Sequence, residues 1–283
     1  RYKCSNLKSL KGLNKWNMQN CYDMSHMFSE CSSLVSLKEL ENWDTQNVMT
    51  IDYLFNGCIS LKSLEGLQKF VVKNANEFSC LFNHCSSIVN VDELENWDVS
   101  NATNIDYLFN NCSSLESIKG LEKWNTSKVE NMSYAFNGCS ELTSVEYLLN
   151  WDTSSVTNMS QLFNGCSGLL CTKGLENWKT CNVTEMYYMF GDCSSLFFLQ
   201  ELENWDTSSV TNMSSMFEEC TSLLSVESLE KWNTSNVTNM SSMFEDCESL
   251  ASLHGLEKWD ISSVTDLSRS LDRKSGSAGM PRP

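Results

Sequence analysis

The sequence predicts an α/β solenoid, an elongated domain of about ten stacked 27-residue units with one short parallel strand and one short helix in each unit. Three ladders of residues carry this prediction, because Trp, Cys and Phe each return after 27 residues, or at one gap after twice 27, without an insertion. A fixed period of this length is typical of arrays in which each unit buries its apolar face only against its neighbours. The ladders are Trp16, Trp43, Trp97, Trp124, Trp151, Trp178, Trp205, Trp232 and Trp259, with Phe70 in the gap; Cys4, Cys31, Cys58, Cys85, Cys112, Cys139, Cys166, Cys193, Cys220 and Cys247; and Phe28, Phe55, Phe82, Phe109, Phe136, Phe163, Phe190, Phe217 and Phe244.

The first half of each unit predicts a short helix. In the unit that begins at Trp205, apolar residues recur at offsets of 3, 6, 7 and 10, which places them on one helical face. They are Val210, Met213, Met216, Phe217 and Cys220. Ser208 or Ser209 could cap the N-terminus of this helix. In other units glycine stands where the helix would end, at Gly57, Gly138 and Gly165.

The second half of each unit predicts a strand. Leu223, Val226 and Leu229 are separated by serines and other small or polar residues, and here the apolar period shortens toward that of a strand. Equivalent strands would stack in parallel, about 4.8 Å apart, with the helices on the other side of the sheet. Just before the last Leu, every second unit over much of the chain has a glycine, which is typical of a bulge or a positive φ: Gly12, Gly66, Gly120 and Gly174.

The repeats predict one domain over residues 1–268, which begins in the middle of a unit. Arg1 stands where other units have Phe, and neither an initiator Met nor a signal peptide precedes it, so we expect a fragment or a processed product. An uncapped solenoid end would expose core, so an upstream segment or a partner should cover it. Residues 269–283 contain the only two prolines and have the composition of a linker, a tail or a cloning scar.

The charge of the chain excludes some partners. The formal net charge is −16, and residues 1–268 alone hold 16 basic and 35 acidic side chains, a net charge of −19. Phosphate binding needs a basic stripe, so we expect no nucleic-acid partner, and anionic membrane surfaces are disfavoured for the same reason. No apolar run approaches the 18 residues of a membrane span, so we expect no membrane insertion.

The ten ladder cysteines predict buried thiols rather than disulfides. Equivalent side chains on stacked units point in the same direction, so neighbouring sulfurs are poorly aimed at each other although their spacing would allow a bond. A thiol in a core acts as a small apolar group. The other four cysteines fall at four different repeat positions without a CxxC motif, so neither a zinc nor a redox site is expected: Cys21, Cys80, Cys171 and Cys181.

Two units, WDTSSVTNMSSMFEECTSLLSV and WNTSNVTNMSSMFEDCESLASL, closely resemble the leucine-rich repeats of BspA-like surface proteins. The mark of that family is W-[DN]-T-S-x-V-T-x-M-x-x-M-F-x-x-C-x-S-L, and the resemblance covers about 265 residues. Where the family commonly ends its repeat in L-x-x-L-x-L, this chain has L-x-x-L-x-x-L, as at Leu223, Val226 and Leu229. The resemblance implies a leucine-rich-repeat solenoid from a bacterial or protist surface protein used for adhesion, without catalytic residues.

No arrangement of side chains predicts an enzyme, a cofactor or a metal site. The three histidines, His26, His84 and His254, occupy three different repeat positions, and no motif brings a nucleophile close to a base. A late acidic group would suit calcium, but no calcium-loop motif accompanies it, so a solvated acidic face is favoured: Asp192, Glu218, Glu219, Glu245 and Asp246.

A threonine column could be compared with the flat hydroxyl arrays of ice-binding solenoids. It consists of Thr126, Thr153, Thr180, Thr207 and Thr234. Other units interrupt it with Met18, Val72, Val99 and Ile261, and it lies two residues from a large Trp. Packing in a corner of the coil is therefore favoured.

The repeat positions that vary suggest where a partner binds. One position, the Lys8 column, reads Lys8, Val35, Lys62, Val89, Glu116, Thr143, Leu170, Phe197, Leu224 and Ala251. Another, the Lys11 column, reads Lys11, Lys38, Glu65, Asp92, Lys119, Glu146, Lys173, Gln200, Glu227 and His254. Contiguous exposed apolar groups commonly mark partner sites. The candidates for partner binding are the apolar Leu170, Phe197, Phe198 and Leu224 and the lysines Lys8, Lys38 and Lys62, unless Leu170, Phe197 and Phe198 only cover a locally wider core.

These observations predict a protein-binding module without catalysis. The leading hypothesis is adhesion or recognition at the cell surface, with a host-matrix or neighbouring-cell protein as the ligand. The alternative is a structural scaffold, intracellular or part of a filament, that binds other copies of itself by end-to-end or lateral contacts. Abundant thiols favour the scaffold, whereas the family resemblance favours adhesion.

Overall fold

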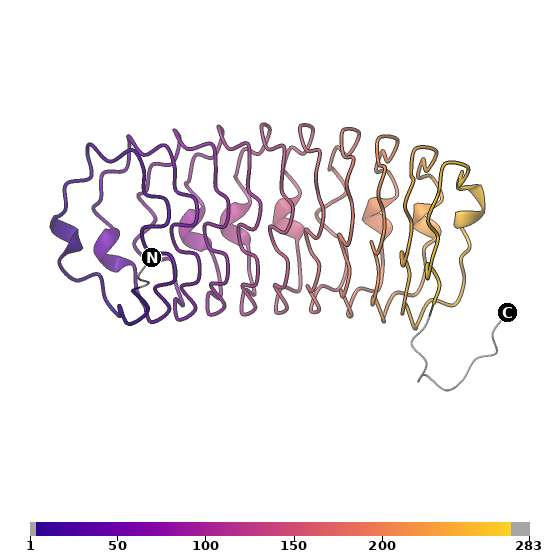
Figure 1. Cartoon of the computed structure of the whole chain (residues 1–283), viewed down its shortest axis with the longest axis horizontal. Helices are drawn as coiled ribbons and strands as arrows, with labels where there is room; N and C mark the ends of the chain where they lie inside the picture. Colours follow the sequence, from indigo (N-terminus) through magenta and orange to yellow (C-terminus); the bar gives the residue numbers. More distant parts are fainter. Residues whose placement is uncertain (1–3, 273–283) are drawn as a thin grey trace.

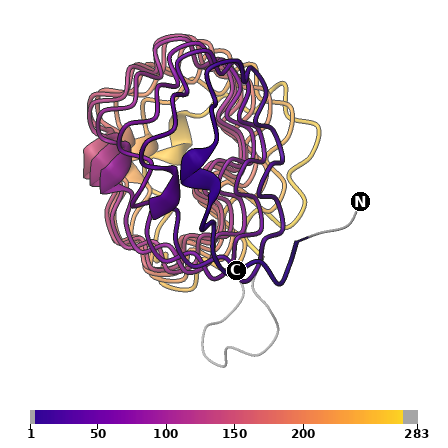
Figure 2. The same ribbon diagram turned by 90° about the vertical axis from the view of Figure 1, so that its left-hand side faces the viewer.

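The computed structural model describes residues 4–272, which wind into a rod of stacked coils (Figure 1). Successive coils lie side by side along the rod, and viewed from the end they nearly superimpose around a common core (Figure 2). The core is one continuous cluster that runs from Leu10 to Cys247. The predicted solenoid is therefore confirmed, and each coil buries its apolar side chains against the coils on either side.

Over much of each coil a buried side chain stands at every third residue. In the last complete coils, Phe217, Cys220 and Leu223 are buried in succession. The backbone N–H of Cys220 donates to the carbonyl of Phe217 at 3.2 Å, and that of Leu223 donates to the carbonyl of Cys220 at 3.1 Å. Each three-residue step is thus a closed turn that returns the chain to the core and leaves two residues facing outward.

The predicted helix over Val210–Cys220 is wrong, because these residues form overlapping turns. Ser215 and Glu219 have φ of 55° and 58°, in the left-handed region that an α-helix of L-residues does not enter. The N–H groups also alternate between two kinds of acceptor. That of Met216 bonds to the carbonyl of Met213 in its own coil, whereas that of Phe217 bonds to Met243 in the next coil at 3.0 Å. An α-helix would keep both bonds within its own coil.

The predicted caps of that helix have other partners. The N–H of Ser208 bonds to the carboxylate of Asp206, and the hydroxyl of Ser209 donates to the carbonyl of Cys181 in the preceding coil. The glycines placed at the helix end do have the left-handed conformation, with φ of 74° at Gly57 and 70° at both Gly138 and Gly165. The conformation was predicted correctly, but it belongs to a turn.

The predicted strands are reduced to isolated parallel bridges between equivalent residues of neighbouring coils, such as Asn212 with Asn239. A strand alternates its side chains with a period of two, and the three-residue steps do not allow that alternation. The regular elements within residues 4–272 are short 3₁₀ helices, most of which line one side of the rod (Figure 1). They are η1 (Leu13–Lys15), η2 (Lys38–Leu40), η3 (Asp92–Leu94), η4 (Lys119–Leu121), η5 (Glu146–Leu148), η6 (Gln200–Leu202), η7 (Glu227–Leu229) and η8 (Leu256–Lys258).

The glycines that precede the last Leu of a unit have the positive φ that was expected at three of four positions. At Gly66 φ is 115°, and a Cβ there would lie 2.2 Å from the carbonyl oxygen of Leu37 in the preceding coil. Gly12 and Gly174 have φ of 102° and 106°. Gly120 does not have a positive φ, because it continues the turn as part of η4.

The Trp column forms the predicted stack at one corner. The rings of Trp178 and Trp205 lie parallel within 3°, with centroids 6.2 Å apart. Each indole Nε1 donates to a backbone carbonyl 30 residues earlier, as from Trp178 to Leu148 at 3.0 Å. Because the rings of the inner coils are almost fully buried, this bond satisfies the one polar group that burial would otherwise leave unpaired.

The Cys column is buried as predicted, from Cys31 to Cys247, whereas Cys4 in the first coil is exposed. Each inner thiol donates to the carbonyl of a Phe in the preceding coil, as from Cys193 to Phe163 at 3.1 Å. Burial raises the pKa of the Cys58, Cys112 and Cys166 thiols to about 12. All fourteen cysteines are free.

The coil continues past residue 268. The N–H of Asp246 bonds to the carbonyl of Asp272 at 2.9 Å, the contact that equivalent residues make in earlier coils. Arg269 has the left-handed φ of its column, at 58°. Residues 269–272 are thus packed as the start of a further coil, and the remainder of the predicted tail lies outside the described residues.

We predict that the ladder thiols are reduced and unreactive in the native protein. Titration in denaturant should find about nine more reactive thiols than titration of the native chain at the same pH, since the inner column is buried. Because the folded pKa values are raised, stability should be fully present below pH 9, the ordinary value, and should fall as the pH rises toward about 12. Mass spectra that showed Cys193 linked to Cys220 would contradict this prediction.

We predict that Trp178→Ala destabilises the rod by about 3 to 5 kcal/mol, the usual cost of removing a buried aromatic side chain. The loss should be concentrated in the adjacent coils, since each coil contacts only its neighbours. Hydrogen exchange would locate it, with Trp16→Ala as the control because Trp16 is 54% exposed. A Trp178→Ala variant that melts like the parent would show that the stacked rings contribute little.

Candidate docking surface

The apolar candidates of the Lys8 column lie outside the core. The exposed fraction is 51% for Leu170, 41% for Phe197 and 45% for Leu224, and it reaches 56% for the neighbouring Phe198. The three-residue period explains this placement, because Leu196 and Leu199 are buried and the two residues between them must face outward. The alternative that Leu170, Phe197 and Phe198 widen the core is therefore wrong.

Backbone bonds place these side chains next to one another as a continuous strip. The N–H of Phe197 donates to the carbonyl of Leu170 at 3.1 Å, and that of Leu224 donates to Phe197 at 3.4 Å. A parallel bridge joins Cys171 to Phe198. The rings of Phe197 and Phe198 have centroids 6.3 Å apart. We call Leu170, Phe197, Phe198 and Leu224 the apolar strip.

A shallow depression of about 410 Å³ borders the strip at Phe198. Its charged lining consists of Glu203, Glu227, Glu230 and Lys231, with uncharged residues between them. The Lys231 ammonium lies 2.6 Å from the Glu203 carboxylate, which leaves two carboxylates in excess on this wall. Sequence analysis missed these groups as part of a site, although all four belong to the recurring segment around L-E-[NK]-W.

The lysine candidates lie apart from the strip. Lys8, Lys38 and Lys62 are exposed in the first three coils, whereas the strip begins in the seventh. Lys38 forms an ion pair with Glu65 at 3.1 Å, and this bond raises the pKa of the Lys38 ammonium. The structure therefore separates the candidate residues into two groups on one side of the rod.

The histidines do not converge on a common site. The ring of His26 stacks on Tyr53 with centroids 4.5 Å apart. His254 pairs with Glu257 at 2.9 Å, and this contact raises the pKa of the imidazole. Within residues 4–272, no group of three or more His, Cys, Asp or Glu side chains could hold a metal ion.

The predicted solvated acidic face is wrong for two of its members. Glu245 is 3% exposed and Asp246 is 5% exposed, so these carboxylates are buried. Glu245 forms an ion pair with Arg269, which compensates part of the cost of burying the charge. Glu218 and Glu219 are partly buried in the preceding coil.

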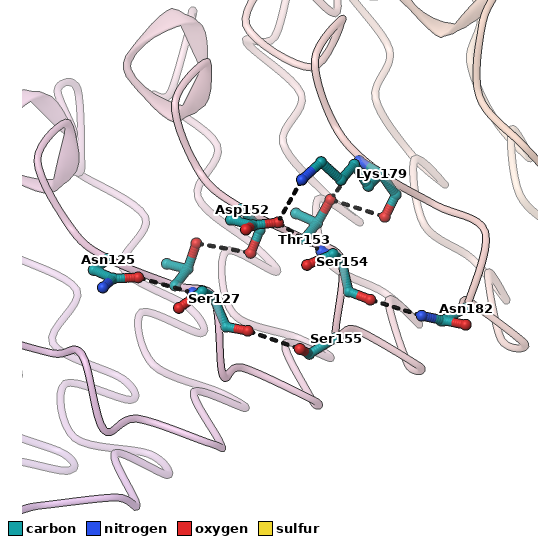
Figure 3. Close-up of polar contacts among 9 residues, drawn as sticks. Asn125, Ser127, Asp152, Thr153, Ser154, Ser155, Lys179 and Asn182 are labelled. Carbon is teal, nitrogen blue, oxygen red and sulfur yellow. Dashed lines mark hydrogen bonds and ion pairs between the residues drawn. The ribbon is translucent and has the colours of Figure 1, made fainter.

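The threonine column packs in a corner of the coil, as predicted. Thr153 is fully buried and its hydroxyl donates to the carbonyl of Lys179 in the next coil at 3.0 Å (Figure 3). On the surface beside it, Ser155 donates to the carbonyl of Ser127, and the Asn182 amide donates to that of Ser154 (Figure 3). These hydroxyls and amides are engaged in bonds between coils, so they do not form a free hydroxyl array.

Among the described residues, none of the helices has the length and apolar character that crossing a bilayer requires.

Several solved structures of bacterial leucine-rich repeat proteins are similar to this chain. One from Bacteroides ovatus is 18% identical, with a TM-score of 0.34, and the match covers 78% of this chain and 64% of that protein. One from Eubacterium ventriosum is 16% identical with a TM-score of 0.42, covering 84% and 59%. A leucine-rich cell surface protein from Faecalibacterium prausnitzii is 16% identical with a TM-score of 0.30, covering 80% and 74%.

This chain thus spans less than two thirds of the first two proteins. The resemblance to BspA-like leucine-rich-repeat proteins that the motif predicts is confirmed. No curated protein sequence matches the chain.

A family model described as "Mycoplasma protein of unknown function, DUF285" matches the repeats in four overlapping segments. The matched residues are 2–119, 81–197, 106–223 and 192–276, which together extend over nearly the whole chain. The period, the ladders and the stacked coils therefore belong to a known repeat family, and this protein is a member of DUF285.

Proposed function

We propose that this solenoid is a non-catalytic protein-binding module and that the apolar strip is where its partner docks. The observation that carries the proposal is the exposure of four large apolar side chains that the repeat does not need for its own packing. At the position of Leu170, Phe197 and Leu224, other coils have Lys, Glu, Thr or Ala and are built in the same way.

The surroundings of the strip support docking. Protein interfaces commonly place aromatic and aliphatic side chains at the centre and polar groups at the rim. Here two phenylalanines stand beside a depression whose wall has an excess of carboxylates. A partner segment with an apolar anchor and basic flanking residues would match both the shape and the charge.

The setting of this activity follows from the family resemblance. Leucine-rich-repeat surface proteins are the class that the repeat motif resembles, so we propose adhesion or recognition at the cell surface. The ligand would be a host-matrix protein or a protein of a neighbouring cell. Lateral assembly of solenoids as a scaffold is the second candidate, and the charges of the Lys11 column favour it, as described in the next subsection.

We predict that Phe197→Ala weakens partner binding by at least about 1 to 2 kcal/mol, as truncation of an interface aromatic does. The melting temperature should stay nearly unchanged, because the ring is 41% exposed. Solubilised host matrix and a surface extract of the parent cell would be passed over the immobilised chain, and bound proteins would be identified and purified for affinity measurements.

Ile59→Ala is the matched control, since Ile59 is 48% exposed at a different repeat position. Equal loss of affinity in both variants, or no loss in either, would refute docking on the strip. The search would then move to the surface around Lys8, Lys38 and Lys62.

A further inference from the structure

Charge is distributed unevenly along the rod. Residues 1–73 hold nine basic and seven acidic side chains, a net charge of +2, whereas residues 74–283 hold 11 basic and 29 acidic ones, a net charge of −18. Because the chain advances steadily from one end to the other, this asymmetry in sequence is an asymmetry in space (Figure 1). Two copies in opposite directions would place the basic end of each against the acidic end of the other.

The Lys8 and Lys11 columns form one exposed face on which this complementarity can be examined. Every member of both columns is exposed, and the residue between Lys8 and Lys11, Leu10, is buried, as are its equivalents in the inner coils. The Lys11 column includes the first residues of η2 to η7, so it follows the row of 3₁₀ helices along one side of the rod (Figure 1). The face is therefore a continuous band that extends over all ten coils.

In the antiparallel arrangement with full overlap, opposite charges meet in the Lys11 column. The first coil then faces the tenth, and each column faces itself. The pairs are Lys11 with His254, Lys38 with Glu227, Glu65 with Gln200, Asp92 with Lys173, and Lys119 with Glu146. Three of the five pairs join opposite charges, and none joins two carboxylates or two lysines.

The Lys8 column is complementary in the same register. Val35 faces Leu224 and Val89 faces Leu170, so exposed apolar groups cover each other. Lys62 faces Phe197, where an ammonium over a ring face is favourable. The remaining pairs, Lys8 with Ala251 and Glu116 with Thr143, bring no like charges together.

Neighbouring registers lose this complementarity. A shift by one coil in one direction sets Lys119 against its own copy and Asp92 against Glu146. The opposite shift sets Glu146 against itself, Lys119 against Lys173, and Glu65 against Glu227. A parallel arrangement sets every charge against its own copy. Like charges across an interface are costly and suppress the wrong pairing.

We propose that the face of the Lys8 and Lys11 columns binds a second copy of this chain, antiparallel and in full register. The two-fold axis lies in the interface between the coils of Lys119 and Glu146, perpendicular to the rod. This inference rests on the proposed function, since it uses the apolar strip, and it names a second copy as the occupant. Copies on one surface would form a scaffold, and copies on two surfaces would join them.

The dimer should be weak and reversible. Ten coils at about 4.8 Å make a face about 50 Å long, and three or four outward residues make it about 10 Å wide. Each copy would bury roughly 500 Å², and the total of about 1,000 Å² is near the lower limit for a specific interface. Since the charges are exposed, the association should weaken as salt is added.

Sedimentation velocity of the full chain, from about 1 to 200 µM, tests the proposal. We expect a concentration-dependent dimer at low salt that dissociates more readily at high salt. Asp92→Lys and Lys173→Asp should each weaken it about tenfold, because the two-fold axis repeats the like-charge contact. The double variant should return the affinity to within about threefold of the parent.

The rescue by the double variant is decisive because Asp92 and Lys173 are three coils apart within one chain. At about 4.8 Å a coil they are separated by roughly 14 Å, too far for an ion pair. Lys128→Glu is the charge-matched control for Lys173→Asp. Lys128 is exposed at another repeat position, where its ammonium contacts Asn101 Oδ1 at 2.6 Å, so this variant should leave the dimer unchanged.

The outcomes separate this proposal from the proposed function. A chain that stays monomeric over the whole range, single variants that dimerise normally, or a double variant that is not rescued would overturn the antiparallel dimer. In those cases Phe197→Ala could still abolish capture of a different partner, and docking on the strip would stand. If the dimer behaves as expected while Phe197→Ala and Ile59→Ala bind captured proteins equally, the strip serves self-association alone.

Discussion

Side-chain hydrogen bonds from one coil to the backbone of the preceding coil hold this rod together. The indole of Trp205 donates to the carbonyl of Leu175, and the thiol of Cys220 donates to that of Phe190. Both bonds span 30 residues, one repeat plus one three-residue step. A buried carbonyl needs a partner, and helices and sheets normally provide it. Here the ladder side chains provide part of that pairing, so the coil can be built from turns.

The three-residue step also divides the sequence into two kinds of position. Because the repeat of 27 is a multiple of three, the inward positions of one coil stay in register with those of the next, and the Trp, Cys and Phe ladders remain continuous. The outward positions are not restricted in this way. The Lys8 column can hold Lys8, Glu116 or Phe197 without any change in the coil, so recognition can be varied independently of folding.

A rigid rod with freely variable outward columns is suited to binding along its length. The apolar strip is continuous because backbone bonds fix Leu170, Phe197 and Leu224 on adjacent coils. Charges on the same face are fixed at regular intervals, so complementarity depends on direction and register and not on any one ion pair. Exposed single pairs such as Lys38 with Glu65 contribute little stability, but their arrangement can select which face binds and in which orientation.

The sequence by itself determined the period, the single solenoid and the burial of the Trp and Cys ladders, because an unbroken repeat makes equivalent side chains stack. It also pointed to Leu170, Phe197 and Leu224 as residues that the core does not require. Only the tertiary structure decided that the coil consists of turns, since offsets of 3, 6, 7 and 10 fit both a helical face and a three-residue step. Left-handed residues such as Ser215 and Glu219 have no signature in sequence, because bonds to the next coil compensate the local cost of that conformation. Exposure of the strip likewise depended on that step, which leaves two outward residues between each pair of buried ones.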